Sequence, residues 1–177
     1  ISTGVGGGVI SGDRLLVGGR GIAAEVGHIT VDPDGPMCGC GHRGHLEAFS
    51  SGTGIVNYVR DEISHGRASS LADSADNLNA AVVARAAEAG DPLASEAFTR
   101  AGTYLGRGIA DMLHLYDPTI VILGGGVTRS GELLLAPVRA ALEASVMSPQ
   151  YLERLVLTTA RLGDQAGLIG ALALARM

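Results

Sequence analysis

The feature that most limits how this chain can fold is the segment 18–45, which is rich in Gly, Pro, Cys and His and has little helix or strand periodicity. An irregular connection this long needs something to hold it in place. It contains both cysteines, Cys38 and Cys40, between His28 and His45. The pattern His-x9-Cys-x-Cys-x4-His, with glycines among the ligands, is typical of a closed tetrahedral metal site. We therefore expect a structural Zn²⁺ ion bound by these four side chains to order the segment.

Two alternatives to this metal site stay open. His42 lies within the same segment and can replace one of the expected histidine ligands. The cysteines can also be reduced side chains with histidines nearby by chance. A disulfide is disfavoured, because cysteines only one residue apart are badly placed to bridge each other. So few cysteines are typical of the reducing cytoplasm, where we expect the protein to reside.

Glycine is the second constraint: 27 of the 177 residues are glycines, and they fall in clusters. The segment 2–8 reads Ser-Thr-Gly-Val-Gly-Gly-Gly and offers hydroxyls and unshielded backbone N–H groups, which suit the phosphates of ATP. It leads into a predicted β-hairpin, 9–10 and 15–17, rather than a helix. The residues that define a Walker loop or a dinucleotide fingerprint are missing. A plain tight turn is the alternative.

The apolar spacing of the remaining chain predicts an α/β fold that ends in a βαβ unit. Expected helices cover 53–64, 80–89 and 93–116, then Pro137 to Val146 and 166–176, and expected strands cover 119–123 and 155–159.

Three glycines, Gly124, Gly125 and Gly126, follow the first strand of this unit. Open α/β sheets bind ligands at the carboxyl ends of their strands. Three consecutive glycines would let an adenosine lie against the backbone. A simple strand-to-helix turn is the other interpretation.

Two carboxylates flank the expected metal site. Glu25 precedes His28 by three residues, and Glu47 follows His45 by two. A metal that orders the histidines would also order these acids, which could then accept hydrogen bonds from the neighbouring hydroxyls of a carbohydrate. Without the metal, both would be ordinary solvated glutamates.

Charge and hydropathy exclude two classes of partner. The net charge is −5 and the 13 Lys and Arg residues form no cluster, so this segment is not expected to bind nucleic acid. The longest apolar stretches fall far short of the ~20 residues that cross a bilayer, so no membrane partner is expected.

These motifs resemble the ROK family of sugar kinases and sugar-responsive repressors. The matching segments are Ser-Thr-Gly-Val-Gly-Gly-Gly at 2–8, Glu-Val-Gly-His at 25–28, Cys-Gly-Cys-Gly-His-Arg-Gly-His-Leu-Glu at 38–47, Ile-Leu-Gly-Gly-Gly-Val at 122–127 and Asp-Gln-Ala-Gly-Leu-Ile-Gly-Ala at 164–171. The resemblance implies an actin-like, hexokinase-like ATPase fold (ribonuclease H-like). Residues 1–177 would form its C-terminal lobe, and the N-terminal lobe is absent from this chain.

The resemblance also implies roles for individual residues. Contacts to the β- and γ-phosphates would come from Thr3, Gly4 and Gly6, and contacts to adenosine from Gly124, Gly125 and Gly126. Sugar hydroxyls would be bound by Glu25, His28 and Glu47. The zinc ligands would be His28, Cys38 and Cys40, with His45 in the position where the family usually has a third cysteine.

The implied activity is transfer of the γ-phosphoryl group of Mg-ATP to the 6-hydroxyl of a hexose. Glucose is the first expectation, with N-acetylmannosamine, N-acetylglucosamine and fructose as alternatives. The family's general-base Asp and first phosphate loop lie upstream, so this chain alone is expected to be inactive. A homodimer is also implied. Two other functions stay open: a regulator with an upstream helix-turn-helix domain, and a non-catalytic assembly lobe.

Overall fold

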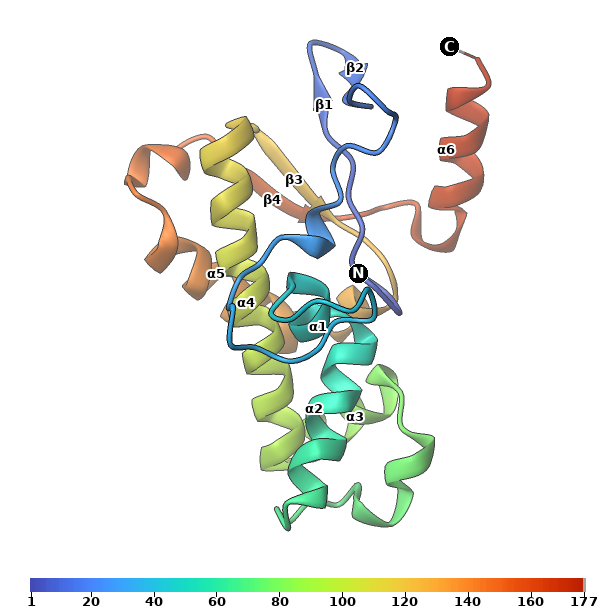
Figure 1. Ribbon diagram of the computed structural model, residues 1–177, viewed down its shortest axis with the longest axis vertical. Coiled ribbons are helices and arrows are strands. Elements are labelled where there is room, and N and C mark those ends of the chain that lie inside the picture. The colour runs from blue at the N-terminus through green and yellow to red at the C-terminus, as the bar shows by residue number, and fades with distance from the viewer. Residues whose placement is uncertain (177) are drawn as a thin grey trace.

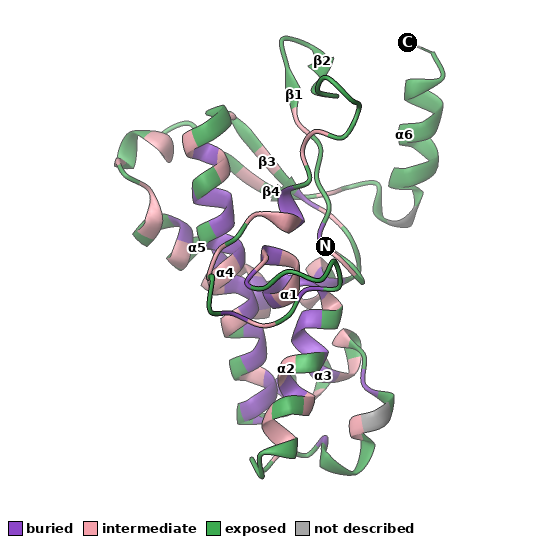
Figure 2. Ribbon diagram, viewed as in Figure 1, coloured by how far each residue is buried: buried purple, intermediate pink, exposed green. Residues whose placement is uncertain are grey.

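The computed structural model describes residues 1–176, except for the side chains of Asp76 and Asp164. One long helix, α4 (Pro92–Tyr116), runs through the middle of the molecule, and the other large helices pack around it (Figure 1). Buried residues follow this helix along its length, whereas the parts drawn at the top of the view are exposed (Figure 2).

The other strands and α-helices are short. In chain order they are β1 (Ile10–Ser11), β2 (Arg14–Leu15), α1 (Leu46–Ser50), α2 (Gly52–Ser64), α3 (Ala80–Glu88), β3 (Ile120–Leu123), α5 (Glu132–Ser145), β4 (Val156–Thr159) and α6 (Ala166–Leu174). The predicted helices over 53–64, 80–89 and 93–116 are confirmed, and the predicted closing helix ends two residues early. In the hairpin, β1 and β2 pair antiparallel, with Ile10 opposite Leu15.

The predicted βαβ unit is confirmed. Strands β3 and β4 are parallel neighbours, with Ile120 opposite Val156 and Leu123 opposite Thr159, and α5 connects them. This places the glycines that follow β3 at the carboxyl edge of the pair, as the sequence predicts.

Helices α4 and α5 approach each other closely because α4 carries glycine at their contact. A Cβ atom on Gly102 would lie 2.6 Å from Cγ of Pro137, and one on Gly106 would lie 2.4 Å from the carbonyl oxygen of Val138. The small-residue face of α4 is therefore used inside the chain, as part of its core.

The sequence predicts that α5 begins near Pro137. This prediction is wrong, because α5 begins at Glu132 and includes the proline. Gly131 precedes the helix with a φ of 57°, a conformation that glycine adopts easily. A proline inside a helix removes one backbone hydrogen bond, here to the carbonyl of Leu133. The same proline ring packs against Gly102 of α4.

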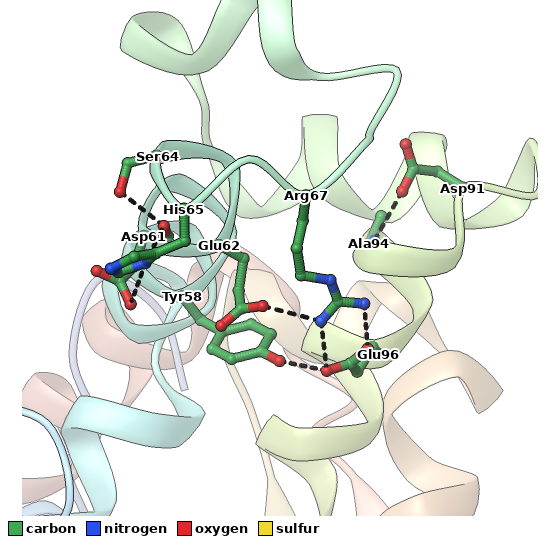
Figure 3. Close-up of polar contacts among 9 residues, drawn as sticks. All are labelled: Tyr58, Asp61, Glu62, Ser64, His65, Arg67, Asp91, Ala94 and Glu96. Atoms are coloured by element: carbon green, nitrogen blue, oxygen red, sulfur yellow. Dashed lines mark hydrogen bonds and ion pairs between the residues drawn. The ribbon is translucent and has the colours of Figure 1, made fainter.

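The start of α4 is fixed by one buried carboxylate. Asp91 caps the helix by accepting a hydrogen bond from the backbone N–H of Ala94 at 2.9 Å (Figure 3). It also accepts bonds from the backbone N–H of Ser70 and from the hydroxyls of Ser69 and Ser70, at 2.6–2.8 Å. Burial alone would raise the pKa of Asp91, but these hydrogen bonds outweigh it and lower the pKa to about 2.

A neighbouring polar network joins α2 to α4 (Figure 3). The guanidinium of Arg67 bridges Glu62 on α2 and Glu96 on α4, at 2.9 and 2.7 Å, and the hydroxyl of Tyr58 donates to the same Glu96. These groups are largely exposed, so they contribute less to stability than the buried Asp91 cap.

Apolar side chains are exposed on three elements at one end of the molecule. Helix α6 has no buried residue, and β3 and β4 are largely uncovered (Figure 2). The large exposed residues there are Ile120, Ile122, Val156, Leu168, Ile169, Leu172 and Leu174. Within the described chain, no helix combines the length and the apolar character needed to cross a bilayer.

Replacing Asp91 by Ala should lower the free energy of unfolding by about 2 kcal/mol at neutral pH, because a helix cap and three further hydrogen bonds are lost. Urea unfolding followed by circular dichroism measures the change. The folded-state pKa of about 2 is below the ordinary 3.8, so the carboxylate stabilises the fold above about pH 4. The difference between wild type and variant should therefore shrink as pH falls towards 2.

The matched control is Asn79→Ala, which removes the exposed cap of α3 and its single bond to the Val82 N–H. It should cost about 0.5–1 kcal/mol. Equal losses in the two variants would contradict the role given to Asp91.

Candidate functional site

The structure brings the four predicted metal ligands together. The ligand atoms of His28, Cys38, Cys40 and His45 all lie within 4.8 Å of one another. The Cys38 sulfur is 3.8 Å from Nδ1 of His28, and the Cys40 sulfur is 3.2 Å from Nδ1 of His45. Both cysteines are free thiols, with Cys38 buried and Cys40 exposed.

The surroundings give the two thiols different acidities. Burial raises the pKa of Cys38. Hydrogen bonds from the backbone and the side chain of His42 lower the pKa of Cys40 to about 6, so it is largely a thiolate at neutral pH. His42, the rival ligand, is not part of the four-residue cluster, and its ring stacks on His45 with centroids 5.7 Å apart.

Sharp bends return the loop to the cluster. Isolated bridges pair Thr30 with His45 and Met37 with Arg43. Gly44, just before His45, has a φ of +72°, and a Cβ atom there would lie only 1.6 Å from the carbonyl oxygen of Asp32. Glycine is therefore required at this bend.

Glu47 joins the loop to the glycine-rich segment at the start of the chain. It lies in the first turn of α1, and its Oε2 accepts a hydrogen bond from the backbone N–H of Val5 at 2.9 Å. Its Oε1 is 3.7 Å from the Cys38 sulfur. A Cβ atom on Gly4 would lie 2.4 Å from Oε2, so the contact requires glycine at that position.

The same segment also packs against the start of the loop. A Cβ atom on Gly27 would lie 1.9 Å from the carbonyl oxygen of Val5, and the Val5 side chain is buried in the core. Val5 thus contacts both ends of the loop 28–45, which carries the four predicted metal ligands, through Gly27 and through Glu47.

The two predicted sugar-binding acids differ in their surroundings. Glu47 is half-buried and hydrogen-bonded, whereas Glu25 is exposed at the start of the 3₁₀ turn Val26–His28. Among the described residues, no hydrogen bond or ion pair reaches the Glu25 side chain. The structure therefore brings Glu47 and His28 together at Cys38, and leaves Glu25 beside them on the surface.

The two predicted nucleotide-binding loops lie side by side. The Ile1 backbone nitrogen lies 2.5 Å from the Gly124 carbonyl oxygen, and the Val127 N–H donates to the Ile1 carbonyl at 3.2 Å. Gly125 has a φ of +101°, and a Cβ atom there would lie 2.3 Å from the Ile1 carbonyl oxygen. Glycine at position 125 is therefore needed for the close approach of Ile1.

A cavity of about 620 Å³ opens where these loops meet α2 and α3. Two of the predicted nucleotide-binding residues, Thr3 and Gly126, line this cavity. Gly6, which is close to Thr3 in sequence, is exposed, and no atom lies within 4 Å of the position that its Cβ would take. It is also lined by residues of α2 and α3 that no sequence motif marks, namely Thr53, Asn57, Arg60, Ala84, Arg85 and Glu88. The helical spacing of these residues predicts α2 and α3, but it does not show which face of each helix lies against the glycine-rich loops.

The whole chain, residues 1–177, matches the ROK family. It is 38% identical over 174 residues to a glucokinase of Thermotoga maritima, an alignment that covers 97% of this chain and 55% of the relative. The chain thus spans little more than half the length of this curated relative.

Two solved structures resemble the fold. One is a ROK family glucokinase of Streptomyces griseus in complex with glucose and AMPPNP, with a TM-score of 0.86, 38% identity and coverage of 99% of this chain and 58% of that chain. The other is a ROK family transcriptional regulator, a homologue of the Escherichia coli MLC protein, with a TM-score of 0.85, 33% identity and coverage of 97% and 43%.

The loop geometry predicts different costs for two glycine substitutions. Gly44→Ala should lower the free energy of unfolding by about 3 kcal/mol or more, because both φ strain and overlap with Asp32 must be relieved. Gly41 also has a positive φ, +91°, but open space around it, so Gly41→Ala should cost only about 1–2 kcal/mol. Urea titration of both variants tests this, and a larger loss for Gly41→Ala would refute it.

Proposed function

Because this chain belongs to the ROK family, we propose that the protein containing it is a sugar kinase that transfers the γ-phosphoryl group of ATP to the 6-hydroxyl of a hexose, glucose first. N-acetylmannosamine, N-acetylglucosamine and fructose are the alternative acceptors. The observation that carries the proposal is the position of Glu47. One carboxylate contacts both the metal loop and the glycine-rich segment, the two parts expected to bind sugar and phosphates.

The proposed nucleotide contacts follow from the similarity to ROK family sugar kinases. The phosphates would be bound by the backbone N–H groups of Thr3, Gly4 and Gly6 and by the Thr3 hydroxyl. The adenosine would lie against Gly124, Gly125 and Gly126, beside the cavity that Gly126 lines together with α2 and α3.

The acceptor would be held by Glu25, His28 and Glu47, which orient the reacting hydroxyl. Mg²⁺ bound with ATP would neutralise charge on the phosphates. The base that takes the hydroxyl proton would be an Asp of an upstream lobe, so the 177 residues alone should not turn over.

The exposed apolar surface supports the assignment of this chain as the C-terminal lobe of a larger protein. Ile120 and Ile122 on β3 and Leu168 and Leu172 on α6 are all about half exposed or more. Apolar residues that cluster at one end of a fold are commonly covered by another domain. An N-terminal lobe packed there would bring its own residues towards the glycine loops.

We also propose that His28, Cys38, Cys40 and His45 bind a structural Zn²⁺ ion. With Zn–S near 2.3 Å and Zn–N near 2.0 Å, a tetrahedral site holds its ligand atoms about 3.3–3.8 Å apart. The donor atoms here lie within 4.8 Å, two of the pairs at 3.8 and 3.2 Å, so the side chains fit the ion with small movements. Two thiolate ligands also agree with a reducing cytoplasm.

A sugar-responsive regulator is the second candidate, because the regulator described above is also similar over nearly the whole chain. The open backbone at Gly6 and the cavity beside Gly126 favour a kinase, since a regulator has less need of an open nucleotide site. A non-catalytic lobe would bind ATP and yield no phosphorylated hexose.

Glu47→Gln in the full-length protein should reduce kcat/KM for glucose about a hundredfold, because a charged acceptor for sugar hydroxyls is lost. Its amide oxygen can still accept from the Val5 N–H, so the KM for ATP should change by less than about threefold. A coupled kinase assay with glucose or ATP varied measures both constants.

Glu47→Ala is the informative companion, because it leaves the Val5 N–H without its acceptor and should weaken ATP use as well. Equal losses for both substrates in Glu47→Gln would remove Glu47 from the sugar site. The isolated 177-residue chain is the negative control for activity, and turnover by it would contradict the need for an upstream base.

Replacing Cys38 or Cys40 by Ser should abolish the zinc content of the purified protein, because three donors no longer close a tetrahedral site. Metal analysis by mass spectrometry should give about one Zn²⁺ per chain in the wild type and much less in either variant. His42→Ala should keep the metal. Unchanged zinc in both cysteine variants would reject the site.

A further inference from the structure

A second cavity, of about 610 Å³, has Thr3, Gly4 and Glu47 of the proposed site in its lining and extends beyond them to residues with no part in the proposed reaction. Its walls are the loop residues 36–39, Thr3 and Gly4 with Glu47, the near side of α2, and Arg100 of α4. Neither Glu25 nor His28 is among the described residues that line it. The volume is that of an ordinary small-molecule site.

Arg100 on α4 lines this cavity with unused hydrogen-bond donors. Its half-buried guanidinium makes no hydrogen bond or ion pair with any described residue. No side-chain nitrogen or oxygen in the described part of the chain is both fully buried and unpaired. The nitrogens of Arg100 must therefore reach solvent, and the cavity that Arg100 lines is the available opening.

Aromatic rings hold this guanidinium in place. Its central carbon lies 4.5 Å from the ring centroid of Phe49, 4.7 Å from that of Tyr58 and 5.5 Å from that of Tyr104. Tyr104 is itself fixed by stacking on Phe49 and by donating to Asp32 at 2.8 Å. The donors of Arg100 are thus oriented before any ligand arrives, which lowers the cost of binding.

The charges on the cavity wall favour a neutral ligand over an anion. Arg100 is the cation of the described lining, and Glu47 and Asp61 contribute two carboxylates. A phosphate would meet more negative than positive charge there. A polyhydroxylated molecule can donate to both carboxylates and accept from Arg100 and from the amide of Asn57.

Apolar parts of the wall suit a sugar ring as well. Pro36, Met37 and the ring of Tyr58 line the cavity beside the polar groups. A pyranose presents apolar C–H groups and hydroxyls around one ring, and this wall offers a surface for both.

We propose that this cavity is a second carbohydrate subsite, which binds a further saccharide ring attached to the hexose that Glu47 contacts. The inference rests on the proposed function, because that function places the first hexose at Glu47. It extends the acceptors from single hexoses to disaccharides with a free 6-hydroxyl.

Calorimetric titration of the full-length protein with glucose, maltose, cellobiose and trehalose tests the subsite. At least one disaccharide should bind as tightly as glucose or more tightly. Arg100→Met should weaken that disaccharide about tenfold or more and leave glucose within about twofold, because the lost donors contact only the second ring. Arg100→Lys keeps the charge and should recover part of the loss.

The matched control is Arg107→Met, since Arg107 also lies over the Tyr104 ring, at 5.2 Å, but is exposed and outside the described cavity lining. It should change neither affinity. Disaccharides that all bind more than about tenfold weaker than glucose would overturn the proposal without any variant. Equal loss of glucose and disaccharide in Arg100→Met, or inorganic phosphate binding that this variant abolishes, would also overturn it. Failure of the proposed function would show separately, as no phosphorylated product from any hexose.

Discussion

The candidate site depends on the close approach of Val5 to both ends of the loop 28–45. Its carbonyl contacts Gly27 so closely that no side chain fits there, and its N–H donates to Glu47. Because the Val5 side chain is also buried in the core, these contacts fix the glycine-rich segment relative to α1. A change in any of the three residues would therefore move the loop and the segment relative to each other.

The scaffold and the site are stabilised in different ways. Around α4, apolar burial and close helix contacts at glycines stabilise the core, and Asp91 is the main polar residue that contributes. The loop 18–45 buries little apolar surface, so the proposed metal bonds would replace the missing core. Loss of the metal should therefore affect the loop far more than the helices.

The sequence was most informative where the signal is local. Helical spacing predicted α4, and the spacing of Cys38 and Cys40 predicted the four-residue cluster, because each pattern lies within one segment. The start of α5 was predicted wrongly because a proline usually marks the first turn of a helix. Here Pro137 lies inside the helix and packs on Gly102, a residue of α4 that is distant in sequence. The contact of Glu47 with Val5 and the rings around Arg100 join separate segments, so no local pattern could show them.

Thr3, Thr53 and Asn57 line both cavities, so the wall between the two is only a few side chains thick. The Thr53 hydroxyl donates to the Thr3 carbonyl at 2.8 Å and ties α2 to this wall. Ligands in the two cavities would contact the same three side chains. Any effect that a ligand in one cavity has on the affinity of the other cavity would have to be reciprocal and of the same size.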